Sequence, residues 1–332
     1  MRELQTLDFE ELIVRISEPA DTLVLFHRNP DADAVGSAFA MKKMLADLGS
    51  RAWCVCESEI PARLLFLTDG EQASVLPESV PADFEIARII AVDTASPAQL
   101  GALYPIYAEH IDLMIDHHGN GEPYADFYIR PEAAATGEIM FDLVKQLATE
   151  GFVSIDDALC TSLYAAISAD TGGFRFANVT PETHLRAAEL MASGIDCAEI
   201  NRRLFDTFSM EQLRARAAGI SNLHLFADGK IAVITFPYAL KAALGLSDEH
   251  LDTLVDVARS LTGVRIAISL RQPGTEGVFR ASVRASCEYD VSALCALFGG
   301  GGHRKAAGCT VTAADMDEAM NLLVSKIDLA AL

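Results

Sequence analysis

An imidazole and two carboxylates lie close together near the N-terminus of the chain. The stretch FHRNPDADAV, residues 26–35, contains His27, Asp31 and Asp33 and begins at the end of the apolar run 23–26. Buried carboxylates repel one another and lose hydration energy unless a cation lies among them. Carboxylate oxygens and imidazole nitrogens are ligands of divalent cations such as Mn²⁺. We therefore expect a cation at this point of the chain.

Three further groups of acidic residues and histidines also come directly after apolar runs. They are Asp93, the triplet Asp116, His117 and His118, and Asp170. A single aspartate after a strand is usually a turn former or a helix cap, and an isolated pair of histidines is more often a surface or core feature than a pair of ligands. The coincidence of four such groups in one domain favours a common site.

Taken together, these groups provide enough ligands for one or two divalent cations: His27, Asp31, Asp33, Asp93, His117 and Asp170. Mn²⁺ is favoured, and Mg²⁺, Co²⁺ and Zn²⁺ remain open. Two ions roughly 3.5–4 Å apart could share a hydroxide nucleophile and stabilise the entering and leaving oxygens of phosphoryl transfer. Asp93 is the candidate bridge, and His118 is the candidate to protonate the leaving oxygen or hold the reacting phosphate.

The elements that must position these residues follow from the hydrophobic pattern. Short apolar runs alternate with amphipathic segments from residue 22 to about 170, which predicts a mostly parallel sheet flanked by helices, an α/β fold. The carboxyl ends of such strands meet at one edge of the sheet, where ligands bind. The expected strands are 22–26, 51–56, 88–92 and 112–115, and a helix is expected at 32–49.

The length of 332 residues favours two domains. We expect a metal-binding domain at 1–185, a helical connector at 186–222 and a smaller α/β domain with a mixed sheet at 223–332, with the active site in the cleft between the domains. Within the second domain, the expected elements are a hairpin over 222–236 that turns at Asp228-Gly229, strands at 264–270 and 278–284, and helices at 247–261, 291–298 and 313–330.

Composition limits the class of partner. A net charge of -21 disfavours the binding of long duplex nucleic acid, which depends on many Lys and Arg contacts to phosphates. The N-terminal residues lack the apolar core of a secretory signal, and no apolar run is long enough to span a membrane. Seven scattered cysteines, an odd number, are interpreted as reduced thiols. A cytoplasmic enzyme or binding protein is the expectation.

The four groups resemble the ordered motifs of the DHH phosphoesterases. The matching residues are His27-x-x-x-Asp31-x-Asp33, the strand-end Asp93, Asp116-His117-His118 and Asp170-Thr171-Gly172. The stretch FGGGGHRKAAGCT, residues 298–310, is similar to the glycine-rich signature of the associated C-terminal domain. Within the family, the chain is most similar to the short bacterial nanoRNases and pAp phosphatases. Two departures are Ala32, where the family usually has glycine, and Gln99, near a position that is often arginine.

This resemblance implies two Mn²⁺ ions and assigns them ligands. One ion would be held by His27, Asp31 and Asp93, and the other by Asp33, Asp93, His117 and Asp170. The implied catalytic residues are Asp93, Asp116 and His118. The implied activity is hydrolysis of very short oligonucleotides to 5′-mononucleotides and of pAp to AMP and phosphate, in a protein that could be a homodimer.

A basic segment of the second domain is the candidate for substrate binding. Residues 264–310 contain six basic residues and three acidic ones, a net charge of +3. Scattered charges are usually a solvated face, and a glycine run can be a flexible turn. Glycines also let backbone N–H groups approach a phosphate closely. The substrate-binding candidates are Arg284, Gly300, Gly301, Gly302 and His303, together with Arg175 beside the fourth motif.

Three other functions remain open at this stage. Hydrolysis of cyclic dinucleotides, or of linear dinucleotides derived from them, would use the same chemistry. Manganese pyrophosphatases share the architecture of the first domain, although the glycine-rich stretch favours nucleotides. A protein of another class, a nucleotide-binding regulator without catalytic activity, could also retain such a metal site. Metal-dependent turnover of a generic phosphodiester would separate it from an enzyme.

Overall fold

A five-stranded parallel sheet forms the centre of the first unit of the chain in a computed structural model, which describes residues 3–119, 121–274 and 277–332. The strand order is β2-β1-β3-β4-β5. Four strands coincide with predicted ones, whereas the edge strand β5 was not predicted because most of its residues are only partly buried. The strands are β1 (Thr22–Leu25), β2 (Ala52–Val55), β3 (Arg88–Val92), β4 (Leu113–Asp116) and β5 (Asp126–Ile129).

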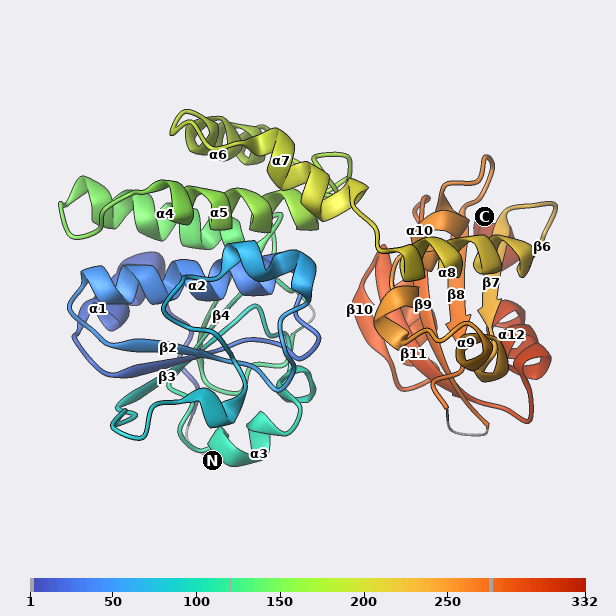
Figure 1. The fold of residues 1–332 in the computed structure, drawn as a ribbon, viewed down its shortest axis with the longest axis horizontal. Helices are drawn as coiled ribbons and strands as arrows, with labels where there is room; N and C mark the ends of the chain where they lie inside the picture. Colours follow the sequence, from blue (N-terminus) through green and yellow to red (C-terminus); the bar gives the residue numbers. More distant parts are fainter. Residues whose placement is uncertain (1–2, 120, 275–276) are drawn as a thin grey trace. The chain divides into compact units, whose positions relative to one another are not determined.

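Helices cover both faces of this sheet, as Figure 1 shows, which confirms the predicted α/β class. Successive strand residues alternate between two cores: Val24 and Ile90 pack beneath the long helices, and Leu23 and Ile89 pack on the opposite face. The first face carries α1 (Phe9–Ser17), α2 (Ala32–Asp47), α4 (Thr136–Thr149) and α5 (Asp157–Asp170), and the second carries α3 (Leu103–Tyr107).

Two glycines allow α2 and α4 to pack closely against α5. A Cβ atom at Gly36 would lie 2.5 Å from the backbone oxygen of Ser162, and one at Gly137 would lie 2.6 Å from the Cβ of Ala166. Any larger residue would force the helices apart. The close packing brings the first turns of α2 and α4 and the last turn of α5 together.

Helical segments continue to residue 221. Thr180 caps α6 by accepting a hydrogen bond from the backbone N–H of Thr183, and Pro181 occupies the first helical position. The first unit spans Met1–Thr207 and the second Phe208–Leu332, so the division falls inside the region expected to be a connector. The segments are α6 (Pro181–Met191), α7 (Cys197–Asn201), a π-helical turn (Arg202–Asp206) and α8 (Met210–Ser221).

The second unit contains a six-stranded mixed sheet in the order β10-β11-β9-β8-β7-β6. β7 and β8 pair in parallel and the other neighbours are antiparallel. The predicted hairpin forms, with positive φ angles at Ala227, Asp228 and Gly229. Its strands are β6 (Leu223–Phe226), β7 (Ile231–Phe236), β8 (Ile266–Arg271), β9 (Val278–Ala285), β10 (Gly301–His303) and β11 (Ala306–Thr312).

Helices pack on both faces of the mixed sheet, with α8 and α10 on one side and α11 and α12 on the other. The helix expected at 247–261 is divided, because a 3₁₀ turn at Asp248–Leu251 precedes the α-helical part. No strand was predicted in the glycine run, but part of it forms the edge strand β10. The helices are α9 (Tyr238–Ala243), α10 (Leu254–Arg259), α11 (Val291–Ala296) and α12 (Met316–Ser325).

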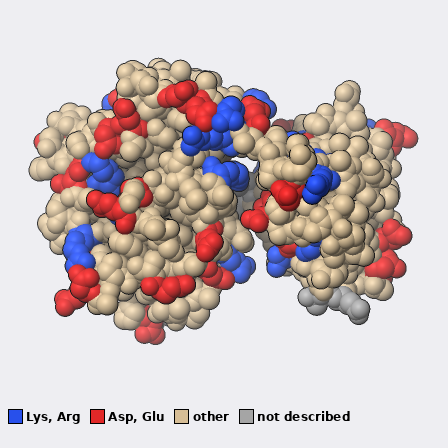
Figure 2. Space-filling view, in the orientation of Figure 1, with Lys and Arg blue, Asp and Glu red and all other residues tan. Residues whose placement is uncertain are grey.

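Acidic side chains are distributed over the visible face of each unit among fewer basic ones (Figure 2), in keeping with the net charge of -21. Among the described residues, no helix combines the length and the apolar character needed to cross a membrane.

Candidate metal centre

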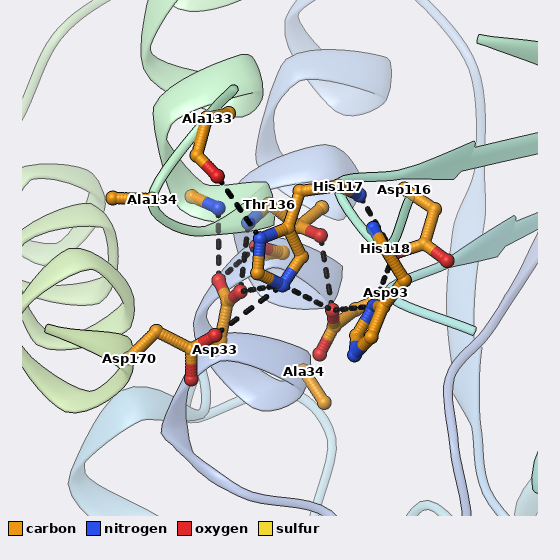
Figure 3. Close-up of polar contacts among 12 residues, drawn as sticks. Asp33, Ala34, Asp93, Asp116, His117, His118, Ala133, Ala134, Thr136 and Asp170 are labelled. Carbon is orange, nitrogen blue, oxygen red and sulfur yellow. Dashed lines mark hydrogen bonds and ion pairs between the residues drawn. The ribbon is translucent and has the colours of Figure 1, made fainter. Parts of the chain in front are cut away.

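The structure brings the predicted ligands together at the carboxyl edge of the parallel sheet. Figure 3 shows Asp33, Asp93, His117 and Asp170 among them. His27, Asp93 and His117 follow the ends of β1, β3 and β4. Asp33 lies in the first turn of α2, and Asp170 is the last residue of α5. The parallel strands and the closely packed helices therefore bring their functional side chains to the same edge of the sheet.

His27, Asp31 and Asp93 form a first group, called here the His27 group, in which one ligand atom of each lies within 4.8 Å of the others. The Nε2 atom of His27 lies 3.5 Å from Oδ2 of Asp93 and 3.8 Å from Oδ1 of Asp31. The other ring nitrogen, Nδ1, is 3.0 Å from the backbone oxygen of Arg28, which orients the ring. Asp31 also caps α2, because its carboxylate accepts the N–H groups of Asp33 and Ala34.

Asp33, His117 and Asp170 form a second group, the His117 group, with ligand atoms within the same 4.8 Å limit. The Nε2 atom of His117 lies 3.3 Å from Oδ2 of Asp170 and 3.9 Å from Oδ2 of Asp33. Its Nδ1 atom is 3.2 Å from the backbone oxygen of Ala133, the arrangement that directs Nε2 toward the carboxylates.

Asp93 faces both groups with different oxygens. Its Oδ2 atom faces His27, whereas Oδ1 lies 3.8 Å from Nε2 of His117 and accepts a 3.0 Å hydrogen bond from the hydroxyl of Thr136. The backbone of Asp93 has a φ of 52°, an uncommon conformation for a residue other than glycine. Such conformations concentrate at functional sites, where the surrounding structure holds them in place. The two oxygens of this carboxylate therefore face different groups of potential ligands.

The first turn of α4 holds the carboxylate of Asp33. The backbone N–H of Thr136 donates to Oδ2 over 2.7 Å, and that of Gly137 donates to Oδ1 over 2.8 Å. Ser37 adds a hydroxyl donor to Oδ1 at 3.1 Å. Because Ala135 provides no capping side chain of its own, Asp33 acts as the cap of α4 from another helix. Thr136 and Ser37 were not predicted from the sequence, and the Ala-Thr-Gly-Glu start of a helix was the available signal for Thr136.

Asp116 orients the imidazole of His118. The distance between Nδ1 of His118 and Oδ1 of Asp116 is 2.7 Å, and the same oxygen accepts the backbone N–H groups of His117 and His118. Asp116 is fully buried. It therefore acts as a positioning residue for His118, whose Nε2 atom points away from it.

The pKa values in the centre reflect an excess of buried negative charge. Burial and the charges of Asp93 and Asp170 raise the pKa of Asp33 well above its usual range. Burial alone would raise the pKa of Asp93 as well, but the hydrogen bond from His27 and the charges of His118 and His117 lower it. Burial opposes a charge on His27, yet Asp31 and Asp93 raise the pKa of its imidazole well above normal. Without a metal, protons on imidazoles and on Asp33 would balance the ionised carboxylates.

The residues at this edge fit a divalent cation. Every ion pair that the carboxylates of Asp31, Asp33, Asp93 and Asp170 make in the described part of the chain is with an imidazole. Aspartate oxygens and imidazole nitrogens are ligands for divalent cations of the Mn²⁺ and Mg²⁺ type. The donor chemistry and the converging geometry are thus compatible with divalent metal binding.

The substrate-binding candidates lie in the second unit, apart from Arg175. The strand register places His303, Ala306 and Arg284 in one row across β10, β11 and β9, although the side chain of His303 lies outside the described structure. Arg284 donates a 3.1 Å hydrogen bond to the backbone oxygen of Val283. Arg175 donates to the backbone oxygen of Gly172, and its guanidinium lies 5.5 Å from the ring centroid of Phe205.

Two of the candidate glycines have a structural reason for being glycine. A Cβ atom at Gly300 would lie 2.2 Å from the backbone oxygen of Gly308, and one at Gly302 would lie 2.6 Å from that of Ala306. Gly302 also has a φ of 138°. A Cβ atom at Gly301, by contrast, would meet open space. Close packing of the β10–β11 hairpin thus accounts for Gly300 and Gly302, whereas no such contact accounts for Gly301.

The chain is similar in sequence to a known protein family and to several curated proteins. A model of the DHH family, N-terminal domain, matches residues 21–167. The bifunctional oligoribonuclease and PAP phosphatase NrnA of Thermus thermophilus is 31% identical over 303 residues, covering 91% of this chain and 87% of that protein. The cyclic-di-AMP phosphodiesterase GdpP of Geobacillus thermodenitrificans is 25% identical over 325 residues, covering 92% of this chain and 46% of that protein.

A solved structure has the same fold over nearly the whole chain. The exopolyphosphatase-related protein from Bacteroides fragilis superposes with a TM-score of 0.83 at 23% identity, covering 95% of this chain and 94% of that one. The family match and the curated relatives define a phosphoesterase, and the structure shows it to be of the α/β class with a centre compatible with divalent cations. The chain belongs to the DHH family.

Proposed function

We propose that the protein hydrolyses very short oligonucleotides to 5′-mononucleotides and removes the 3′-phosphate of pAp, using two Mn²⁺ ions. The observation that carries this proposal is the position of Asp93, whose two oxygens face the His27 group and the His117 group. A carboxylate shared in this way is typical of two-metal centres that act on phosphoesters. The similarity to NrnA, a bifunctional oligoribonuclease and PAP phosphatase, supports this choice of substrates.

The residues of the centre have different roles in hydrolysis. Divalent cations at this site supply the Lewis acidity that activates water and stabilises charge on the phosphoryl oxygens. The residues that would hold the cations are His27, Asp31, Asp33, Asp93, His117 and Asp170. His118 gives a proton to the leaving oxygen as its bond to phosphorus breaks. Asp116 holds the His118 ring by its Nδ1 atom, which leaves Nε2 as the nitrogen that acts on the substrate.

A second candidate function is the hydrolysis of cyclic dinucleotides or of the linear dinucleotides derived from them. The similarity to a cyclic-di-AMP phosphodiesterase over 92% of this chain favours it, and the ligand arrangement serves either substrate. We infer a cytoplasmic location from the nature of these substrates.

A substrate panel tests the proposal directly. The purified protein is incubated with Mn²⁺ and with pAp, pApA, five-nucleotide RNA, 24-nucleotide RNA, cyclic di-AMP or pyrophosphate, and the products are identified by chromatography. We expect AMP from pAp and mononucleotides from the two short RNAs, with slow or no release from 24-nucleotide RNA and pyrophosphate. Preference for the longest RNA or for pyrophosphate would overturn the proposal, whereas preference for cyclic di-AMP would select the second candidate.

Arg284 is proposed to bind the terminal phosphate of the substrate. Replacing it by methionine removes charge-assisted hydrogen bonds, each about 1.5–3 kcal/mol, so we expect KM for pAp and short RNA to rise about 10- to 100-fold. Arg280→Met is a matched control, because this arginine lies four residues earlier on β9 and is more exposed. Steady-state kinetics and Mn²⁺ titration measure the two effects. An unchanged KM for every nucleotide, or a loss of Mn²⁺ binding, would contradict the assignment.

A further inference from the structure

One turn of the chain contacts three of the proposed metal ligands. This turn, residues 133–137, is called here the ligand turn. Its Ala133 carbonyl faces Nδ1 of His117, and its Thr136 and Gly137 N–H groups donate to Asp33. The Thr136 hydroxyl donates to Asp93 (Figure 3). A displacement of the ligand turn would therefore move ligands of both metal groups at once.

Two side chains outside the ligand set hold the ligand turn at Ala134. The backbone N–H of Ala134 donates to Oε2 of Glu138 over 3.2 Å. Its backbone carbonyl accepts a 3.0 Å hydrogen bond from Nδ2 of Asn178, which also donates to the carbonyl of Asp170 over 3.1 Å. Both polar backbone groups of this residue are thus fixed by side chains rather than by regular secondary structure.

Glu138 is in turn held by a network of partly buried charges. The Nη1 atom of Arg186, on α6, lies 3.6 Å from Oε2 of Glu138. Arg186 also donates to both oxygens of Asp142, to which Arg130 donates over 2.6 Å. Burial alone would raise the pKa of Asp142, but the hydrogen bonds from Arg186 and Arg130 hold it below its usual range. Only 2% of Glu138 is exposed, so the surrounding residues rather than solvent must provide the partners of its carboxylate.

We propose that Glu138 and Arg186 are positioning residues of the metal centre. They hold the ligand turn where Asp33, Asp93 and His117 are spaced to bind cations, although neither is a ligand itself. Some residues orient metal ligands through hydrogen bonds without binding the metal. Replacing such a residue typically changes metal affinity or activity by about 10- to 100-fold. The inference rests on the proposed metal centre but not on its substrate, because metal binding alone can test it.

If Glu138 only stabilised the fold, its replacement would have a different effect on the affinity for Mn²⁺. Lys145 and Glu189 form a 2.5 Å ion pair that also links α4 to α6, but it is exposed and does not contact the ligand turn. Replacing Glu189 by alanine is therefore a matched control for Glu138→Ala. If Glu138 served only to join the two helices, both replacements would leave the affinity for Mn²⁺ unchanged.

The experiment is a Mn²⁺ titration of the full chain by calorimetry, with thermal unfolding of each metal-free variant in parallel. We expect Glu138→Ala to weaken Mn²⁺ binding about 10- to 100-fold. Glu138→Gln keeps an acceptor for the Ala134 N–H and should recover part of this loss, and Glu189→Ala should bind as the wild type does. Asn178 is exposed, so Asn178→Ala should preserve the fold and should weaken binding by releasing the other side of Ala134.

The outcomes separate this inference from the proposed function. If the wild type binds no divalent cation, the metal centre itself is wrong. If the wild type binds Mn²⁺ and Glu138→Ala binds it equally well, with or without a lower melting temperature, Glu138 is a structural residue only. If Glu138→Ala fails to fold, the Mn²⁺ affinity of two other variants decides the question. Weaker binding by Asn178→Ala would show that the ligand turn must be held in place, and weaker binding by Arg186→Lys would show that the charge network holds it. Wild-type affinity in both variants would contradict the inference.

Discussion

Replacing Asp93 by asparagine is expected to reduce Mn²⁺-dependent hydrolysis of pAp by at least about 1,000-fold, which corresponds to about 4 kcal/mol. The amide has one acceptor oxygen and no charge, whereas the carboxylate of Asp93 directs one oxygen toward each metal group. Asparagine is chosen because it tolerates the positive φ at this position, so the backbone should be retained. Initial rates give the loss of activity, and calorimetric titration gives the number of Mn²⁺ ions bound, which should fall.

Asp157→Asn is the matched control for this prediction. Asp157 is an exposed aspartate at the start of α5, the helix whose last residue is Asp170. Its replacement removes the same charge from the same unit and should leave both activity and metal binding unchanged. Wild-type activity and stoichiometry in Asp93→Asn would rule out Asp93 as the shared ligand.

Replacing His118 by asparagine is expected to lower kcat on pAp by about 100- to 10,000-fold, the usual contribution of a general acid or base. Mn²⁺ affinity should change little, because the proposed ligand sets do not include His118. The leaving group provides the sharper measurement. A nitrophenolate is stable enough to leave without a proton. The oxygen of a nucleoside must be protonated as it leaves. Hydrolysis of bis-p-nitrophenyl phosphate should therefore suffer much less than hydrolysis of pApA.

Equal losses on both substrates would contradict the role of His118 as a proton donor. That result would favour the other role considered for His118, in which its imidazole holds the reacting phosphate. Asp116→Asn provides a related comparison, because this carboxylate contacts the Nδ1 atom of the same ring. It should reproduce the leaving-group dependence of His118→Asn with a smaller loss, since the ring remains but is less well oriented.

The ligands could be grouped from the sequence because the signal for each of them lies in the few residues that precede it. His27, Asp93 and His117 each follow an apolar run short enough to be a buried strand, and parallel strands present their carboxyl ends at one edge. The strand order and the parallel pairing of β1, β3 and β4 bear out that expectation.

The contacts that hold the ligands could not be predicted, because they depend on tertiary packing. The hydrogen bonds from Thr136 and Gly137 to Asp33 join residues 103 and 104 positions apart, and they require the close approach of α2 and α4. The strand at Gly301 was missed for another reason. Glycine has a low strand propensity, and only pairing with β11 places this segment in the sheet.

Asp33 and Asp170 differ in what each carboxylate does for the folded chain. That of Asp33 completes the first turn of α4, a contribution of about 0.5–2 kcal/mol for a typical cap. Within the described structure, the carboxylate of Asp170 takes part only in the ion pair with His117. A descendant that had lost the reaction would therefore still be selected to keep a capping side chain, aspartate or asparagine, at position 33, but it would be free to lose the aspartate at position 170. Among divergent relatives, the residue at position 170 is thus the better indicator of retained catalysis.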